Sequence, residues 1–159
     1  MKIVCLLLLV VFVTNQSSAC DCNYQGPFLK MARHSSLVAF VKIRNHISQA
    51  AMEVEILDVF HGSESRKVIT VWGDDGKLCR PYTSQFQKDT FYVIAFYAGE
   101  PGGHPDEKES DYHISNCGAY WLSANMKDST VSGDISSSTR TIQTLLLSEL
   151  KSFFVKKNG

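Results

Sequence analysis

Two cysteines separated by one residue, Cys20 and Cys22, directly follow an apolar N-terminal stretch. If the chain is cut before Cys20, the new terminus carries an α-amine next to the Cys20 carbonyl group. Such an amine has a pKa of about 7.7–8.0, so making it neutral at pH 7 costs only about 1 kcal/mol. The nitrogen and the carbonyl oxygen can then close a five-membered chelate ring on a metal ion. A catalytic zinc held by three histidines has a position occupied by water, and this terminus is chemically able to displace that water.

The stretch before Cys20 has the pattern of a secretory signal peptide. An unbroken apolar run at residues 3–13 follows a lysine, and small residues stand at Ser17 and Ala19. The run is too short to span a bilayer, and the small residues fit signal-peptidase cleavage. We therefore predict a signal peptide at residues 1–19, a secreted product with no transmembrane segment, and Cys20 as its first residue. The alternative is a bacterial lipoprotein anchored in the cell envelope, in which lipidation would consume the Cys20 thiol.

The cysteines of the mature chain predict disulfide bonds. Cys5 would leave with the signal peptide, so Cys20, Cys22, Cys79 and Cys117 remain. An even number in an exported chain indicates disulfides, and four cysteines allow three pairings. A Cys20–Cys22 bond would close a small strained ring, so each should have a distant partner, and we favour Cys20–Cys79 with Cys22–Cys117. A four-thiolate zinc site is the alternative, but CxxC spacing is absent and oxidising conditions disfavour it.

Two such disulfides would convert a terminus that normally frays into a rigid one. A pre-ordered terminus binds a metal with little further loss of conformational entropy. The residues therefore indicate an inhibitor that acts on the zinc of another protein.

The other residues that could carry chemistry form no motif. The five histidines lack metal-ligand spacing, and Asp74-Asp75-Gly76 lacks the further oxygen ligands of a calcium loop. The chain has no serine triad with motif spacing and no phosphate-binding glycine loop. We predict that the protein is not an enzyme, needs no cofactor and holds no metal by itself. The 16 basic residues balance the 16 acidic ones, so nucleic acid is not an expected partner.

The elements that must position the terminus are mainly strands. Segments with the apolar patterns of strands occur at residues 37–44, 52–60, 68–72 and 91–97, and a short fifth strand is expected at residues 112–115. The fourth is apolar on both faces, which predicts a central strand. An Asp-Gly pair after the third predicts a tight hairpin turn. A short helix is expected at residues 28–34, and residues 98–111 should form a solvated loop.

The last part of the chain changes period. Residues 139–156 have apolar side chains at three- and four-residue intervals and predict an amphipathic helix, capped by Ser137 or Ser138. Residues 129–138 are polar and should be mobile. Together the elements predict a mainly β fold, a five-stranded OB-type barrel whose open side is covered by the C-terminal helix. We expect one domain at residues 20–159, with a core at about 20–122 and the polar stretch and helix at 123–159.

The cysteines and strands between residues 20 and 122 form a set with a known counterpart. Its members are Cys20-x-Cys22 after the signal, the strand at 37–44, the Asp58-Val59-Phe60-His61-Gly62 segment, Cys79 before Tyr82, the strand at 91–96, and Cys117 before Tyr120-Trp121. In these features the chain resembles the N-terminal, netrin-like domain of the tissue inhibitors of metalloproteinases, in a minimal form.

The resemblance implies a netrin-like barrel, the same cysteine pairing and a zinc metalloprotease as the protein partner. It implies that the Cys20 amine and carbonyl chelate the target's catalytic zinc. By position, Asp21 would point toward the S1′ pocket of the protease. The neighbouring contact ridge would consist of Cys22, Asn23, Lys77, Leu78 and Asn116.

Asp21 departs from the family pattern, which has a small threonine or serine there. A carboxylate would enter a mostly apolar pocket close to the catalytic glutamate of the protease, and this can cost several kcal/mol. The family's third disulfide also has no cysteines here. The alternative function is therefore an exported netrin-like module that binds a protein without inhibiting a protease.

Overall fold

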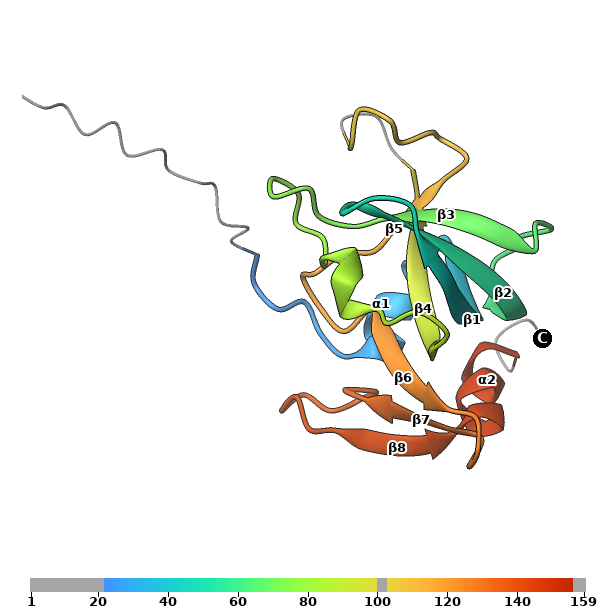
Figure 1. The fold of residues 1–159 in the computed structure, drawn as a ribbon. Helices are drawn as coiled ribbons and strands as arrows, with labels where there is room; N and C mark the ends of the chain where they lie inside the picture. The colour runs from blue at the N-terminus through green and yellow to red at the C-terminus, as the bar shows by residue number, and fades with distance from the viewer. Residues whose placement is uncertain (1–21, 100–102, 156–159) are drawn as a thin grey trace, which may run out of the picture.

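The computed structural model describes residues 22–99 and 103–155, and in this part of the chain five strands close into a barrel. In spatial order these strands are β1 (Leu37–His46), β2 (Ala51–His61), β3 (Val68–Trp72), β5 (Tyr112–His113) and β4 (Phe91–Ala98) (Figure 1). β3 pairs with β5 in parallel, and the other pairs are antiparallel. Pairing of β4 with β1 completes the ring. The predicted mainly β fold with a five-stranded barrel is confirmed.

β1 and β4 form the centre of the core because both edges of each strand are paired. β1 lies between β2 and β4, and β4 pairs with β1, β5 and β6 (Trp121–Asn125). The side chains of residues 37–41 and 92–96 are all buried. A strand covered on both faces needs a continuous apolar run rather than an alternating one. The prediction of a central fourth strand is therefore correct.

β2 bends around the barrel at two bulges. Val38 pairs with His61 and Ala39 with Val59, so Phe60 is an extra residue in this strand. A second shift between the partners of Phe40 and Val41 leaves Leu57 without a partner on β1. Bulges increase the local bend and twist of a strand, which helps a small sheet to close. They also interrupt the alternation of β2, since Leu57 is exposed.

A meander of three strands, β6, β7 (Thr130–Gly133) and β8 (Gln143–Leu146), extends the sheet from β4 (Figure 1). None of the three was expected, and the prediction of a mobile segment at residues 129–138 is wrong where β7 lies. β6 and β7 are short and show no sustained alternation, and the leucines of β8 fit the helical period predicted for residues 139–156. The three strands are stabilised by pairing, including a 2.8 Å contact between the hydroxyl groups of Ser132 and Thr144.

The predicted C-terminal helix is present as α2 (Leu147–Val155) but begins later than residue 139. Residues 143–146 pair with β7, and Arg140 has a left-handed backbone with φ +55°. Ser137 and Ser138 therefore do not cap the helix. The helix starts where the Leu147 amide donates to the Ser129 carbonyl oxygen, at 2.9 Å.

One face of α2 packs between β2 and the β7–β8 pair (Figure 1). Leu150 is fully buried, and the Phe154 ring lies 6.2 Å from the ring of Phe60 on β2. Lys151 forms a 2.6 Å ion pair with Asp58 of the same strand. The helix thus covers one side of the barrel, as predicted, but with fewer apolar residues than the sequence period indicated, because Phe153 is 53% exposed.

The short N-terminal helix is α1 (Phe28–Ala32), and it buries Phe28, Met31 and Ala32. The predicted signal peptide, residues 1–19, lies outside the described residues. Among the described helices, none has the length and apolar character needed to cross a bilayer.

Replacing Leu150 with alanine should lower the free energy of unfolding by about 2–5 kcal/mol, because a fully buried leucine leaves a cavity when truncated. Phe153→Ala is the matched control on the same helix, and we expect it to change stability by less than about 0.5 kcal/mol. Urea denaturation followed by circular dichroism measures both. Equal losses for the two variants would show that α2 packs through a different face.

Candidate functional site

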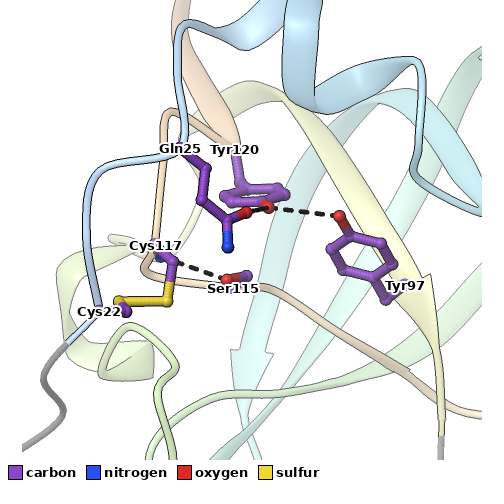
Figure 2. Close-up of a disulfide and its surroundings, with 6 residues drawn as sticks. All are labelled: Cys22, Gln25, Tyr97, Ser115, Cys117 and Tyr120. Carbon is purple, nitrogen blue, oxygen red and sulfur yellow. Dashed lines mark hydrogen bonds between the residues drawn. A yellow bond between two sulfur atoms is a disulfide. The ribbon is translucent and has the colours of Figure 1, made fainter.

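Three segments that are distant in sequence meet beside the N-terminal end of the described chain: residues 22–26, 74–81 and 115–119. The first and third are joined by the Cys22–Cys117 disulfide, whose Cα atoms are 5.5 Å apart (Figure 2). The Gln25 amide also donates to the Cys117 carbonyl oxygen at 2.7 Å, and the Ala119 amide to that of Gly26 at 3.0 Å. The predicted Cys22–Cys117 bond is present, and main-chain bonds reinforce it.

The second segment is attached next to this disulfide. The Asn116 amide donates to the Cys79 carbonyl oxygen at 3.0 Å. The Sγ atoms of Cys22, Cys79 and Cys117 all lie within 4.8 Å of one another. Cys79 is itself in a disulfide, and its predicted partner, Cys20, lies outside the described residues. These sulfurs are therefore oxidised, whereas a metal site would need thiolates.

The predicted contact ridge is carried by these three segments. Asn23, Lys77 and Asn116 are exposed, while Cys22 and Leu78 are half-buried. Each of these residues is adjacent in sequence to one of the three clustered cysteines or is itself one, except Lys77, which stands two positions before Cys79. Asp21, like Cys20, lies outside the described residues.

The Asp-Gly turn after β3 shapes the loop that presents Lys77 and Leu78. One carboxylate oxygen of Asp74 accepts hydrogen bonds from the amides of Gly76 and Leu78, both at 2.9 Å. Asp75 accepts from the Lys77 amide at 3.0 Å, and Gly76 has φ +95°, a conformation that favours glycine. The predicted turn therefore exists, but the predicted hairpin is wrong because β3 pairs with β2 and β5 rather than with the next strand. The turn instead rigidifies one side of the ridge.

A buried ion pair anchors the residue after Cys79. Nη1 of Arg80 lies 2.6 Å from Oε2 of Glu107, and the two side chains are 6% and 1% exposed. Glu107 also accepts a 3.1 Å hydrogen bond from the His104 amide and lies 3.5 Å from Nδ1 of His113. Several hydrogen bonds to a buried carboxylate offset the cost of removing it from water.

The segment that carries Glu107 was predicted to be a solvated loop, and for part of it this is wrong. Asp111 is also buried and accepts a 2.9 Å hydrogen bond from the indole N–H of Trp72. Charged residues among glycines and prolines are typical of a solvent-exposed loop. The sequence does not show that Glu107 pairs with the buried side chain of Arg80.

Two tyrosine hydroxyl groups form a hydrogen-bonded chain near the Cys22–Cys117 disulfide. The hydroxyl groups of Tyr97 and Tyr120 are 3.2 Å apart, and that of Tyr120 donates to the Gln25 side-chain oxygen at 3.1 Å (Figure 2). Burial and the contact with Tyr97 raise the pKa of the Tyr120 phenol, so this donor stays protonated at physiological pH. With Ser115 and His113 these residues line a hollow of about 350 Å³. The Tyr120 hydroxyl thus links Gln25 of the N-terminal segment to Tyr97 of β4 through two hydrogen bonds.

The N-terminal segment is also attached to the loop between β7 and β8. The Tyr24 hydroxyl donates to Asp134, and burial together with this bond raises the pKa of Tyr24 to about 12. The Arg140 guanidinium lies over the Tyr24 ring, 3.9 Å from its centre. The amides of Phe28 and Leu29 donate to the carbonyl oxygens of residues 134 and 135, both at 2.9 Å.

Comparison with family models, with curated proteins and with solved structures finds no match to this chain.

Replacing Arg80 with methionine should destabilise the protein by about 3–5 kcal/mol, because it leaves the Glu107 carboxylate buried without its cation. The matched control is Arg44→Met, which removes an exposed arginine 3.2 Å from Glu55 and should cost less than about 1 kcal/mol. Chemical denaturation at pH 7 measures both values. If Arg80→Met is as mild as the control, the ion pair does not anchor the Cys79 segment.

Proposed function

We propose that this chain is a secreted inhibitor of zinc metalloproteases that acts through its mature N-terminus. The observation that carries the proposal is the attachment of the segment starting at Cys22. A disulfide to Cys117 and main-chain bonds at Gln25 and Gly26 hold the residues directly after Cys20 and Asp21. Because this segment is ordered before binding, chelation by the adjacent Cys20 amine and carbonyl loses little conformational entropy.

The surface beside this terminus supports a protein partner. Asn23, Lys77 and Asn116 offer exposed amide and ammonium groups on three rigid segments, with Leu78 half-buried among them. A hollow of about 890 Å³ borders the same Asp74–Gly76 turn and is lined in part by the exposed ring of Tyr82. In our proposal the ridge contacts the rim of the protease cleft, while the terminus reaches the zinc.

The inhibitory chemistry requires an uncharged amine at residue 20. In the proposed complex the amine nitrogen and carbonyl oxygen of Cys20 replace the zinc-bound water, and the side chain of Asp21 enters the S1′ pocket. The chain itself supplies only these two donor atoms and the rigid segments that position them. Its function is binding: the terminal ammonium first loses one proton to solvent, and no covalent bond between heavy atoms of the inhibitor is made or broken.

Adding one alanine before Cys20 should abolish inhibition, because it converts the amine into a peptide nitrogen that cannot ligate zinc. We expect a loss of at least about 100-fold in affinity, equivalent to about 2.7 kcal/mol. Cleavage of fluorogenic peptides by a panel of zinc proteases measures it, after mass spectrometry has verified each N-terminus. An alanine added after Gly159 is the matched control and should leave inhibition unchanged.

Two outcomes would reject the proposal. Either the N-terminally extended and native forms inhibit equally, or neither inhibits any protease of the panel although both carry the Cys22–Cys117 bond. In the second case a non-protease partner whose binding is unaffected by the extension would support the alternative, a protein-binding module.

Replacing Asp21 with threonine should strengthen inhibition of proteases with an apolar S1′ pocket by about tenfold or more. The substitution removes a carboxylate that would be desolvated next to the catalytic glutamate of the protease. Inhibition constants of the Asp21→Thr and native forms against the same panel measure the effect. Weaker inhibition by Asp21→Thr would show that Asp21 pairs with a basic group of the target.

A further inference from the structure

We propose that the disulfide of Cys79 is a site of thiol–disulfide exchange with a dithiol reductant. Its reduction would then transfer the neighbouring disulfide from Cys22–Cys117 to Cys79–Cys117. The exchange stands on the arrangement of the sulfur atoms. Only its consequence for inhibition rests on the function proposed above.

The three sulfur atoms are close enough for exchange after a small movement. All lie within 4.8 Å of one another, although they come from segments far apart in sequence. A thiolate at Cys79 would therefore have both sulfurs of the Cys22–Cys117 bond next to it. Such an internal nucleophile reacts at a high effective concentration compared with an external thiol.

Exposure decides which disulfide a reductant reaches first. Cys79 is exposed, whereas Cys117 is only 8% exposed and Cys22 is half-buried. Thiol–disulfide exchange depends on access to the attacked sulfur. An external dithiol should therefore reduce the Cys79 disulfide before it reaches the Cys22–Cys117 bond.

Main-chain contacts decide which new bond forms. The 3.0 Å hydrogen bond from the Asn116 amide to the Cys79 carbonyl oxygen places residues 79 and 117 on adjoining segments. Arg80, paired with buried Glu107, fixes the Cys79 side of this contact. A Cys79–Cys117 bond would connect two segments that are already in contact, so the backbone need not move far.

The dithiol reduces the Cys79 disulfide, becomes an internal disulfide itself, and leaves Cys79 and its partner as thiols. The Cys79 thiolate then attacks Sγ of Cys117, which forms the Cys79–Cys117 bond and breaks the Cys22–Cys117 bond. Cys22 leaves as a thiolate and takes up a proton. The second step needs no further electrons.

The product would lack the covalent link between the N-terminal segment and the rest of the barrel. Gln25 and Gly26 would still be held by main-chain hydrogen bonds, but no disulfide would restrain Cys22. Reduction of the disulfide of exposed Cys79 by a dithiol would therefore release the terminus that we propose binds zinc.

Disulfide mapping of the full mature chain tests the exchange. One equivalent of dithiothreitol is added at pH 8, thiols are blocked with N-ethylmaleimide after an acid quench, and linked peptides are identified by mass spectrometry. We expect a Cys79–Cys117 link with blocked Cys22. A retained Cys22–Cys117 link beside blocked Cys79, or a Cys22–Cys79 link, would overturn the proposal.

A parallel reduction at pH 4 identifies the bond that is cut first. A phosphine reductant works there, while a thiol with a pKa of about 8.5 supplies almost no thiolate for exchange. We expect blocked Cys79 and an intact Cys22–Cys117 link. Cleavage of the Cys22–Cys117 bond first would contradict the proposed order.

The matched control combines Cys20→Ser with Cys79→Ser and so removes the internal nucleophile and its predicted partner. Its Cys22–Cys117 bond should be lost about tenfold more slowly than in the native chain at pH 8, because the buried sulfur must then react with external thiol. Equal rates would overturn the proposal. An exchange seen in a chain that inhibits no protease would reject the proposed function and leave the exchange intact.

Discussion

The pairing of β4 with β1 is the constraint on which the rest of the structure depends. Six consecutive residues of β1, from Leu37 to Lys42, are in register with Phe96 to Phe91 of β4, and this pairing turns an open sheet into a ring. Closure removes two sheet edges and surrounds the core with strands. It also fixes the loops that leave the strands, because strands in a closed barrel cannot slide relative to one another without breaking the ring.

The candidate site consists of three segments that local contacts attach to the closed barrel and to one another. Residues 74–81 leave β3, residues 115–119 lie between β5 and β6, and residues 22–26 enter the structure before α1. The Cys22–Cys117 bond and the Asn116–Cys79 hydrogen bond join the three. Buried partners behind them, the Arg80–Glu107 pair and the tyrosine hydroxyl chain, reduce the freedom of each segment. These contacts therefore hold the loops of the candidate site in place on the barrel.

The features that the sequence predicted well are those with a strong local signal. Four of the five barrel strands carry apolar runs or alternation, the exception being the two-residue β5. Cysteine spacing excludes only a Cys20–Cys22 bond, and Cys22–Cys117 belongs to the pairing that we favoured and that the family resemblance implies. β6 and β7 were missed because they are short and pair through main chain and hydroxyl groups such as that of Ser132, which gives no sustained alternation, whereas the leucines of β8 fit the period of the helix that follows. Arg80 and Glu107 were missed because their pairing joins positions whose proximity exists only in the folded chain. The late start of α2 has a similar cause, since the pairing of β8 with β7 overrides helical propensity at residues 143–146.

The hydrogen bonds that Phe28 and Leu29 make to residues 134 and 135 bear on how far this protein can be trimmed. The polar stretch after residue 122 reads as an appendage, yet Ile135 is 1% exposed and Tyr24 reaches the Asp134 carboxylate. A fragment that ends at residue 122 would keep every barrel strand. It would lose the hydrogen-bond partners of Tyr24, Phe28 and Leu29 in the N-terminal segment. The smallest fragment that keeps the N-terminal segment attached on this side must therefore retain the meander.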